Sequence, residues 1–159
     1  MTLRQLSELS VHYQASVYPA VPAHAHAKTT YSDTTANGLA KCIVDFCKYM
    51  NHFDGVAVVA MRTGNEGRYR PGQVITNVLG QQKQLAGQWL PGMNNGMSDT
   101  QITLNGRVYY VEIKIGKDRQ SDAQKKFAEQ VTRGGAVYQI VKSWPEFYKF
   151  FESITADAQ

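Results

Sequence analysis

The chain has 159 residues, of which 43% are hydrophobic and 19% charged, a balance typical of one ordinary globular domain. No apolar run approaches the roughly eighteen residues of a membrane-spanning helix, and the first residues lack the apolar stretch of a signal peptide, so we expect a cytoplasmic protein with no membrane partner. The net charge of +4 permits a polyanionic partner without requiring one, and Cys42 and Cys47 form no CxxC metal signal and are expected to be buried or free thiols.

Residues 1–32 are predicted to form an N-terminal extension and linker, and residues 33–155 to form a single folded domain. Ser32 or Asp33 can cap a helix that runs to about His52. The apolar residues of this helix follow the i, i+4, i+7, i+11 spacing of one core-facing stripe, and they are Leu39, Ile43, Phe46 and Met50.

A short apolar run over residues 56–61 is predicted to be a buried strand. Residues 62–96 are rich in Gly, Asn, Gln and Arg, and we expect a long loop there, with a hairpin between 73–75 and 88–90 as the structured alternative. A loop of this length in a compact domain is usually functional or disordered.

A β-hairpin is predicted from residues 100–104 and 107–115, because Asn105-Gly106 between them is a strong signal for a two-residue turn. If these two residues form the turn, Leu104 pairs with Arg107, and the same register places Asp99 opposite Glu112. Opposed residues on one face have Cβ atoms about 5 Å apart.

Asp99, Glu112 and Lys114 share one face of this hairpin, since side chains alternate along a strand. Two adjacent carboxylates repel unless a positive charge lies between them, and carboxylate oxygens suit Mg²⁺ or Mn²⁺ better than zinc. Such an ion would activate water and neutralise charge on a phosphoryl group. The alternative is a plain salt-bridged strand face, which would contribute under about 1 kcal/mol of stability if exposed.

The next predicted helix, residues 122–133, starts after Ser121 and ends at Gly134-Gly135. Gln124 lies on its apolar stripe and needs a polar partner there, either the carboxylate face of the hairpin or solvent at the stripe edge. An apolar strand over 136–141 and a final helix opened by Pro145 follow. The aromatic side chains of that helix predict either a dimer interface or a packed C-terminal cap.

Basic residues gather before and after the predicted hairpin and are candidates for binding phosphates. They are Arg62, Arg68 and Arg70 in the long loop, and Lys117, Arg119 and Lys125 after Lys114. Contacts of this kind would give strongly salt-dependent binding to a polyanion, and an ordinary solvated face is the alternative.

Four motifs resemble, in this order, those of the virus-type replication-repair nuclease (VRR-NUC) domain, which belongs to the PD-(D/E)XK restriction-endonuclease-like superfamily. They are Ser98-Asp99, Glu112-Ile113-Lys114, Gln120-Ser121-Asp122-Ala123-Gln124 and Gly135-Ala136-Val137-Tyr138. The match is densest over residues 96–152, and the helix and strand of 33–61 suit the superfamily's αβββαβ core. The resemblance therefore implies an α/β fold with a mixed central sheet flanked by helices.

The resemblance also implies a metal-dependent DNA endonuclease that hydrolyses phosphodiester bonds in double-stranded or branched, Holliday-junction-like DNA. Asp99, Glu112 and the carbonyl of Ile113 would hold Mg²⁺ or Mn²⁺, Lys114 would be the catalytic lysine, and Gln124 the family's helix residue. Small stand-alone members resemble junction resolvases, tend to be homodimers and often come from phages, so a homodimer in a bacterial or phage-infected cell is expected.

The chain departs from the family pattern in two places. Many members carry a Glu on the first helix, where this chain has the neutral Asn37, and Ser98 precedes Asp99 where the superfamily has a nominal proline. The departure at Asn37 supports an alternative: a catalytically weak or inactive DNA-binding or assembly module with the nuclease fold. An RNA substrate is a third alternative, for which the 2′-hydroxyl is the physical discriminator.

Overall fold

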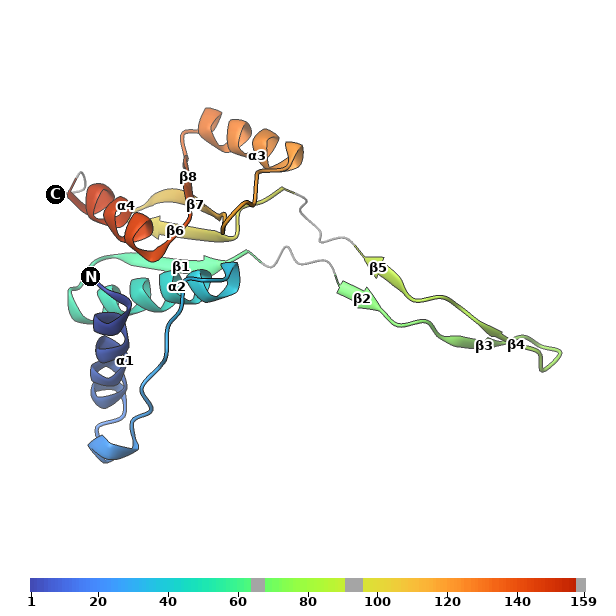
Figure 1. The fold of residues 1–159 in the computed structure, drawn as a ribbon, viewed down its shortest axis with the longest axis horizontal. Coiled ribbons are helices and arrows are strands. Elements are labelled where there is room, and N and C mark those ends of the chain that lie inside the picture. The colour runs from blue at the N-terminus through green and yellow to red at the C-terminus, as the bar shows by residue number, and fades with distance from the viewer. Residues whose placement is uncertain (64–67, 91–95, 157–159) are drawn as a thin grey trace.

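A computed structural model describes residues 1–63, 68–90 and 96–156, which form a mixed α/β fold (Figure 1). The elements in chain order are α1 (Leu3–Val17), the short 3-10 helix η1 (Ala23–Ala25), α2 (Ala36–Phe53), β1 (Val58–Arg62), β2 (Arg68–Arg70), β3 (Val74–Thr76), β4 (Gln82–Gln84), β5 (Gln88–Leu90), β6 (Thr100–Leu104), β7 (Arg107–Ile113), α3 (Asp122–Arg133), β8 (Val137–Val141) and α4 (Trp144–Ala156). Within these described ranges, no helix combines the length and apolar character needed to cross a membrane.

The central sheet has four strands in the order β1-β6-β7-β8. β1, β6 and β7 are antiparallel neighbours, whereas β8 returns through α3 to pair parallel with β7, so the sheet is mixed. Figure 1 shows α2 on one side of this sheet and α3 on the other. The predicted order of helix, strand, two-strand hairpin, helix, strand and helix is confirmed for α2, β1, β6–β7, α3, β8 and α4, while β2 to β5 are additional strands between β1 and β6.

The β6–β7 hairpin turns at Asn105-Gly106 as the sequence predicts. Both residues have positive φ, 47° and 79°, which a two-residue turn matched to the strand twist requires. The observed register pairs Leu104 with Arg107 and Thr100 with Val111, which confirms the predicted pairing.

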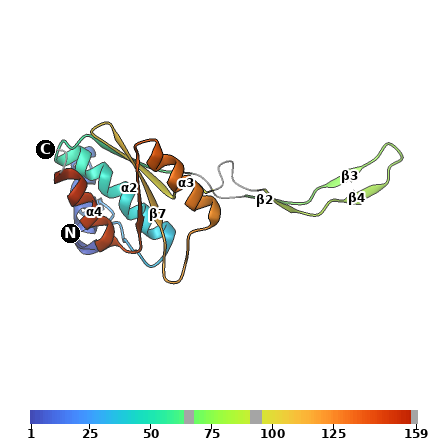
Figure 2. The ribbon, with the colours of Figure 1, turned by 90° about the horizontal axis from the view of Figure 1, so that it is seen from above.

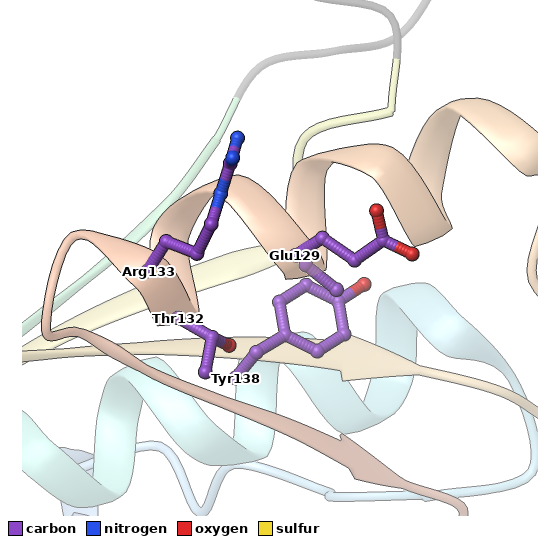
Figure 3. Close-up of a pocket in the computed structure, with 5 residues that line it drawn as sticks. Glu129, Thr132, Arg133 and Tyr138 are labelled. Atoms are coloured by element: carbon purple, nitrogen blue, oxygen red, sulfur yellow. The ribbon is translucent and has the colours of Figure 1, made fainter.

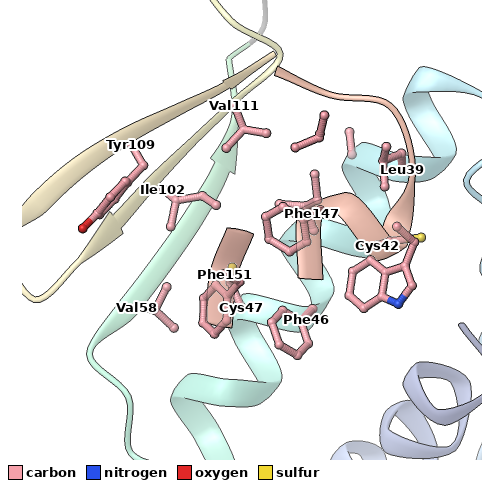
Figure 4. Close-up of a cluster of buried hydrophobic side chains, with 14 of the residues drawn as sticks. Leu39, Cys42, Phe46, Cys47, Val58, Ile102, Tyr109, Val111, Phe147 and Phe151 are labelled. Atoms are coloured by element: carbon pink, nitrogen blue, oxygen red, sulfur yellow. The ribbon is translucent and has the colours of Figure 1, made fainter. Parts of the chain in front are cut away.

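The hydrophobic core lies between the sheet and the pair α2 and α4 (Figure 4). The predicted stripe of α2 faces this core, and Phe46 makes edge-to-face contacts with Trp144, Phe147 and Phe151 of α4. Ring pairs of this geometry are worth about 1 kcal/mol each beyond the area they bury. The aromatic face of α4 is therefore used inside the chain, as a packed C-terminal cap.

The N-terminal cap of α2 differs from the prediction. Thr35, and not Ser32 or Asp33, accepts the backbone N–H of Gly38 through its side chain. Asp33 instead accepts the backbone N–H of Trp144 at 2.8 Å, where it ties the start of α4 to the segment before α2. Asp33, two residues before the N-cap of α2, thus binds the beginning of α4 instead.

Residues 1–32, expected to be an extension and linker, contribute to the core. The helix α1 begins with a capping box between Thr2 and Gln5 and packs on α2. Leu6 is fully buried, and the indole of Trp144 donates a hydrogen bond to the carbonyl of Met1 at 2.9 Å. Both ends of the chain thus meet at the same core.

Within the predicted long loop over 62–96, residues 68–90 contain two short antiparallel strand pairs, whereas 64–67 and 91–95 lie outside the described residues. β2 pairs with β5, and β3 pairs with β4, so the expected pairing of 73–75 with 88–90 is wrong. Every residue of β3 and β4 is exposed, so neither face has the alternation of buried and exposed side chains that reveals a strand in a sequence. Figure 2 shows this two-stranded ribbon running away from the rest of the molecule.

Both cysteines are free and fully buried, which confirms the expectation of buried thiols. Burial raises the pKa of Cys42 to about 11, with a further contribution from the charge of Asp33, and burial alone raises the pKa of Cys47 to about 12. Because the thiolate is the reactive form, both groups should be nearly inert at ordinary pH.

We expect the native protein to resist alkylation by iodoacetamide at pH 8. A thiol of pKa near 11 is ionised there to about one part in a thousand, against about a quarter for a free cysteine, and burial also blocks access. Mass spectrometry should find both cysteines unmodified in the folded protein and both labelled after denaturation. Prompt labelling of the native protein would contradict this assignment.

Candidate functional site

The acidic residues that the sequence singles out lie at one end of the central sheet, on neighbouring strands. Asp99 immediately precedes β6 and Glu112 is in β7, where the observed register continues to place the two opposite each other. The Asp99 carboxylate accepts the backbone N–H of Ile113 at 2.8 Å, and the carbonyl of Asp99 accepts the N–H of Thr63. Asp99 is thus fixed both to β7 and to the end of β1.

Glu112 is fully buried and has hydrogen-bond partners on both carboxylate oxygens. Lys114 Nζ lies 2.9 Å from Oε1, the Gln124 amide donates to the same oxygen, and the Tyr138 hydroxyl donates to Oε2 at 3.2 Å. Burial is the largest influence on its pKa and raises it above the usual range, as does the charge of Asp99, while the bond to Lys114 acts in the opposite direction. These partners compensate the carboxylate for the loss of its hydration, which would otherwise make a buried charge unfavourable.

Lys114 is also buried and is shared among three acceptors. Its Nζ reaches Glu112, the Asp118 carboxylate at 3.3 Å and the Gln124 carbonyl oxygen at 3.0 Å. Burial acts to lower its pKa, but the hydrogen bonds and charges of Glu112 and Asp118 outweigh burial and hold the pKa above its ordinary value. Lys114 is therefore a permanently charged ammonium at neutral pH.

Gln124 links the helix α3 to the carboxylate face, as one of the two sequence-based alternatives predicts. Its side chain donates to Glu112 and accepts from Lys114, and it also accepts the N–H of Ser121 in the capping box that begins α3. The ring of Phe127, one turn along, packs against Tyr110 and Tyr138 of the sheet and so holds α3 in place.

Three further residues, for which the sequence pattern predicts no role, belong to this cluster. Tyr138 donates to Glu112, Gln120 donates to the Tyr138 hydroxyl at 3.2 Å, and Asp118 pairs with Lys114. Tyr138 lies opposite Tyr110 in the parallel β7–β8 pairing, and therefore on the face that also carries Glu112. That pairing is the signal for Tyr138, but it depends on a long-range register that no turn motif specifies.

The donor set of the cluster fits a hard divalent cation. Asp99 and Glu112 supply carboxylates, and Ile113, whose carbonyl is the expected third ligand, is held between them through its N–H bond to Asp99. Within the described ranges, no group of three or more His, Cys, Asp or Glu side chains is arranged to hold a metal ion. A metal ion at this site would therefore have two side-chain ligands, Asp99 and Glu112. Asp99, Glu112 and Asp118 together exceed the single charge of Lys114 by two, which a divalent ion would neutralise.

Asn37 lies in the first turn of α2 and accepts a hydrogen bond from the guanidinium of Arg62. Arg62 ends β1 and lies opposite Thr100, the residue after Asp99. The helix position that carries a Glu in many members of the resembled family is thus occupied by an amide whose oxygen binds an arginine.

The other basic candidates are spread over separate elements and do not share one loop. Arg68 and Arg70 are on β2 of the ribbon, where Arg70 is exposed and the Arg68 side chain lies outside the described part of the structure. Lys117 and Arg119 are exposed in the segment between β7 and α3, directly after Lys114. Lys125 is exposed on α3 and pairs with Asp122 at 3.0 Å.

An open pocket is lined by residues of α3 and β8 (Figure 3). Its lining residues are Ala128, Glu129, Thr132, Arg133 and Tyr138. Among these five only Tyr138 belongs to the cluster, through its bond to Glu112. The pocket is therefore a neighbour of the site and not the site itself.

No known family model matches the chain. A search for similar curated proteins also found no match.

We expect Lys114→Met to lower the free energy of unfolding by about 3 kcal/mol, because removing one partner leaves the buried Glu112 carboxylate without its cation. In the double variant Glu112→Gln/Lys114→Met neither group is charged, so its free energy of unfolding should fall much less. Urea denaturation of the metal-free proteins near neutral pH measures both values. An equal loss in the single and double variants would show that the pair has no such coupling.

Proposed function

We propose that this chain is a Mg²⁺- or Mn²⁺-dependent DNA endonuclease with a restriction-endonuclease-like core. The observation that carries the proposal is the cluster of Asp99, buried Glu112 and charged Lys114, joined by Gln124 from the neighbouring helix. This set of residue types is the one that the VRR-NUC resemblance implies for phosphodiester hydrolysis.

The order of the elements supports the same proposal. The run α2, β1, β6, β7, α3, β8, with three antiparallel strands followed by a parallel one, is compatible with the αβββαβ core that the resemblance implies. The residues of the proposed site come from the end of the hairpin and from the first turn of α3, so they lie on rigid elements.

The chemistry that a bound Mg²⁺ or Mn²⁺ supplies is the acidification of a water molecule and the neutralisation of negative charge on the phosphate. Lys114 adds a fixed positive charge, which can orient the attacking water or stabilise negative charge that develops on the phosphoryl oxygens. Gln124 and Tyr138 hold Glu112 and Lys114 in one orientation, so they act as positioning residues.

Exposed basic residues beside the cluster are the basis for proposing DNA as the substrate. Lys117 and Arg119 lie three and five residues after Lys114, and Arg62, at the end of β1, lies opposite Thr100, the residue after Asp99. Phosphate contacts by such residues would make binding strongly dependent on salt.

A second candidate function is a DNA-binding or assembly module that retains this fold but cleaves weakly or not at all. The observation that favours it is Asn37, whose amide oxygen binds Arg62 where an acidic side chain would provide a further metal ligand. Tight metal-independent binding to four-way junctions, without cleavage in any divalent metal, would support this candidate.

We expect the wild-type protein to nick supercoiled plasmid or cleave a synthetic four-way junction with Mg²⁺ or Mn²⁺, and to be inactive in EDTA. Asp99→Asn and Glu112→Gln should each reduce cleavage by about a hundredfold or more, because each removes one charged ligand. Gel assays of cleavage rate measure the effect, with single-stranded and duplex RNA as alternative substrates.

The matched control is Glu129→Gln, which makes the same change of carboxylate to amide at an exposed position of α3 outside the cluster. It should cleave at the wild-type rate. Equal activity of Asp99→Asn, Glu112→Gln and wild type would refute the nuclease proposal. Faster cleavage of RNA than of DNA would identify RNA as the substrate.

The homodimer implied by the resemblance is retained as part of this proposal, although α4 no longer provides its interface. Among the described residues, exposed large apolar side chains on the sheet lie on its two edge strands: Val59 and Met61 of β1, which are 57% and 52% exposed, and Val137 of β8, which is 37% exposed. Light scattering should give twice the chain mass of 17.8 kDa. A mass near that of one chain would exclude the dimer under the conditions used.

A further inference from the structure

The two-stranded ribbon of β2 to β5 is the largest feature of the fold that the proposed site does not use. Among the described residues its strands form only two-stranded sheets, and every residue of β3 and β4 is exposed. An isolated two-stranded ribbon buries too little to stabilise a core. Figures 1 and 2 show it extending well beyond the sheet and helices, which makes it a surface for contact with another molecule.

The charge of the ribbon is of one sign. Residues 68–90 contain Arg68, Arg70 and Lys83 and no Asp or Glu, so this segment carries three of the four net positive charges of the chain. Arg70 and Lys83 are exposed, and within the described residues neither forms an ion pair. The ribbon is thus complementary to a polyanion and is repelled by the ribbon of a second copy.

The dimensions of the ribbon suit the major groove of duplex DNA. Its two strands lie about 4.8 Å apart, and a groove about 12 Å wide admits a two-stranded ribbon with its side chains. Residues 68–79, at about 3.3 Å per residue, reach at most about 40 Å, which exceeds the length of about 34 Å of one turn of B-DNA. The deep and narrow major groove of duplex RNA does not accept such an element.

The side chains of the ribbon have the chemistry of base-edge contacts. The register places Thr76 opposite Gln82 and Val74 opposite Gln84 on one face, and Gln amides can bind an adenine edge at two atoms. At the tip, Val78 and Leu79 are 103% and 79% exposed, and apolar side chains of this kind contact the methyl group of thymine.

The tip itself is held by Asn77. Its side-chain oxygen accepts the backbone N–H groups of Leu79 and Gln81, both at 3.0 Å, so the turn that presents Val78 and Leu79 is ordered by local hydrogen bonds.

We propose that residues 68–90 form a DNA-binding arm that lies along the major groove of duplex DNA, with Arg70 and Lys83 on phosphates and the tip against base edges. This inference rests on the proposed function in one respect, that the polyanion is DNA. It adds a binding element that projects from the same end of the sheet as Asp99, since the arm lies in the chain between β1 and β6.

The test is fluorescence anisotropy in EDTA, with a labelled DNA duplex of about four helical turns and the duplex RNA of the same sequence, over a series of salt concentrations. Arg70→Gln/Lys83→Gln should lower the slope of log affinity against log salt by about two, one for each lost phosphate contact, and weaken binding about tenfold or more. Val78→Ser/Leu79→Ser should weaken binding without changing that slope.

The matched control is Arg107→Gln/Lys149→Gln, which removes the same charge from exposed positions on β7 and α4, outside the ribbon. It should bind DNA as the wild type does. The inference is overturned if the ribbon variants bind like wild type, if this control loses as much affinity as they do, or if duplex RNA binds as tightly as DNA. A change in the mass of the ribbon variants by light scattering, with DNA binding unchanged, would assign the ribbon to a second copy instead.

The two proposals fail separately in these experiments. If the wild type cleaves DNA and the ribbon variants bind DNA normally, the DNA-binding arm is refuted and the nuclease proposal stands. If binding depends on the ribbon but no divalent metal supports cleavage, the nuclease proposal is refuted and the DNA-binding arm stands.

Discussion

The register of the β6–β7 hairpin is the constraint on which the rest of this structure depends. Asn105 and Gly106 both adopt positive φ, and that turn leaves one way for the two strands to pair. A slip of one residue would move every side chain of a strand to the opposite face. Glu112 would then point into the hydrophobic core, and Val111 would take its place on the face that α3 covers.

Given that register, the electrostatics of the cluster follow from burial. Glu112 is fully removed from water, so each of its partners offsets part of a desolvation cost that one lysine alone would not cover. The side chain of Gln124 makes three interactions at once: it takes part in the capping box of α3, binds Glu112 and orients Lys114. Gln124 therefore links the position of the helix, which Phe127 also holds, to the geometry of the cluster.

The parts of the structure that the sequence predicts well are those governed by local rules. The turn at Asn105-Gly106, the stripe of α2 and the inward direction of Gln124 each follow from spacing within a few residues. Tyr138 depends on the parallel pairing of β7 with β8 across a helix, which no local motif specifies. The strands β3 and β4 lack a buried face, so the hydrophobic alternation by which strands are recognised is absent there. The helix α1 joins the core by packing on α2, and Trp144 binds the carbonyl of Met1 just before it; no local motif specifies either contact.

The place where the ribbon joins the sheet has a consequence for how this protein can change. β1 and β6 are antiparallel neighbours, and Arg62 and Thr100, which face each other, mark the points where the chain leaves and re-enters the sheet. An insertion between such neighbours alters no strand order, and added length in a closed loop raises its entropic cost only slowly. The ribbon can therefore be lengthened, shortened or exchanged, in evolution or by protein engineering, while the fold keeps its topology.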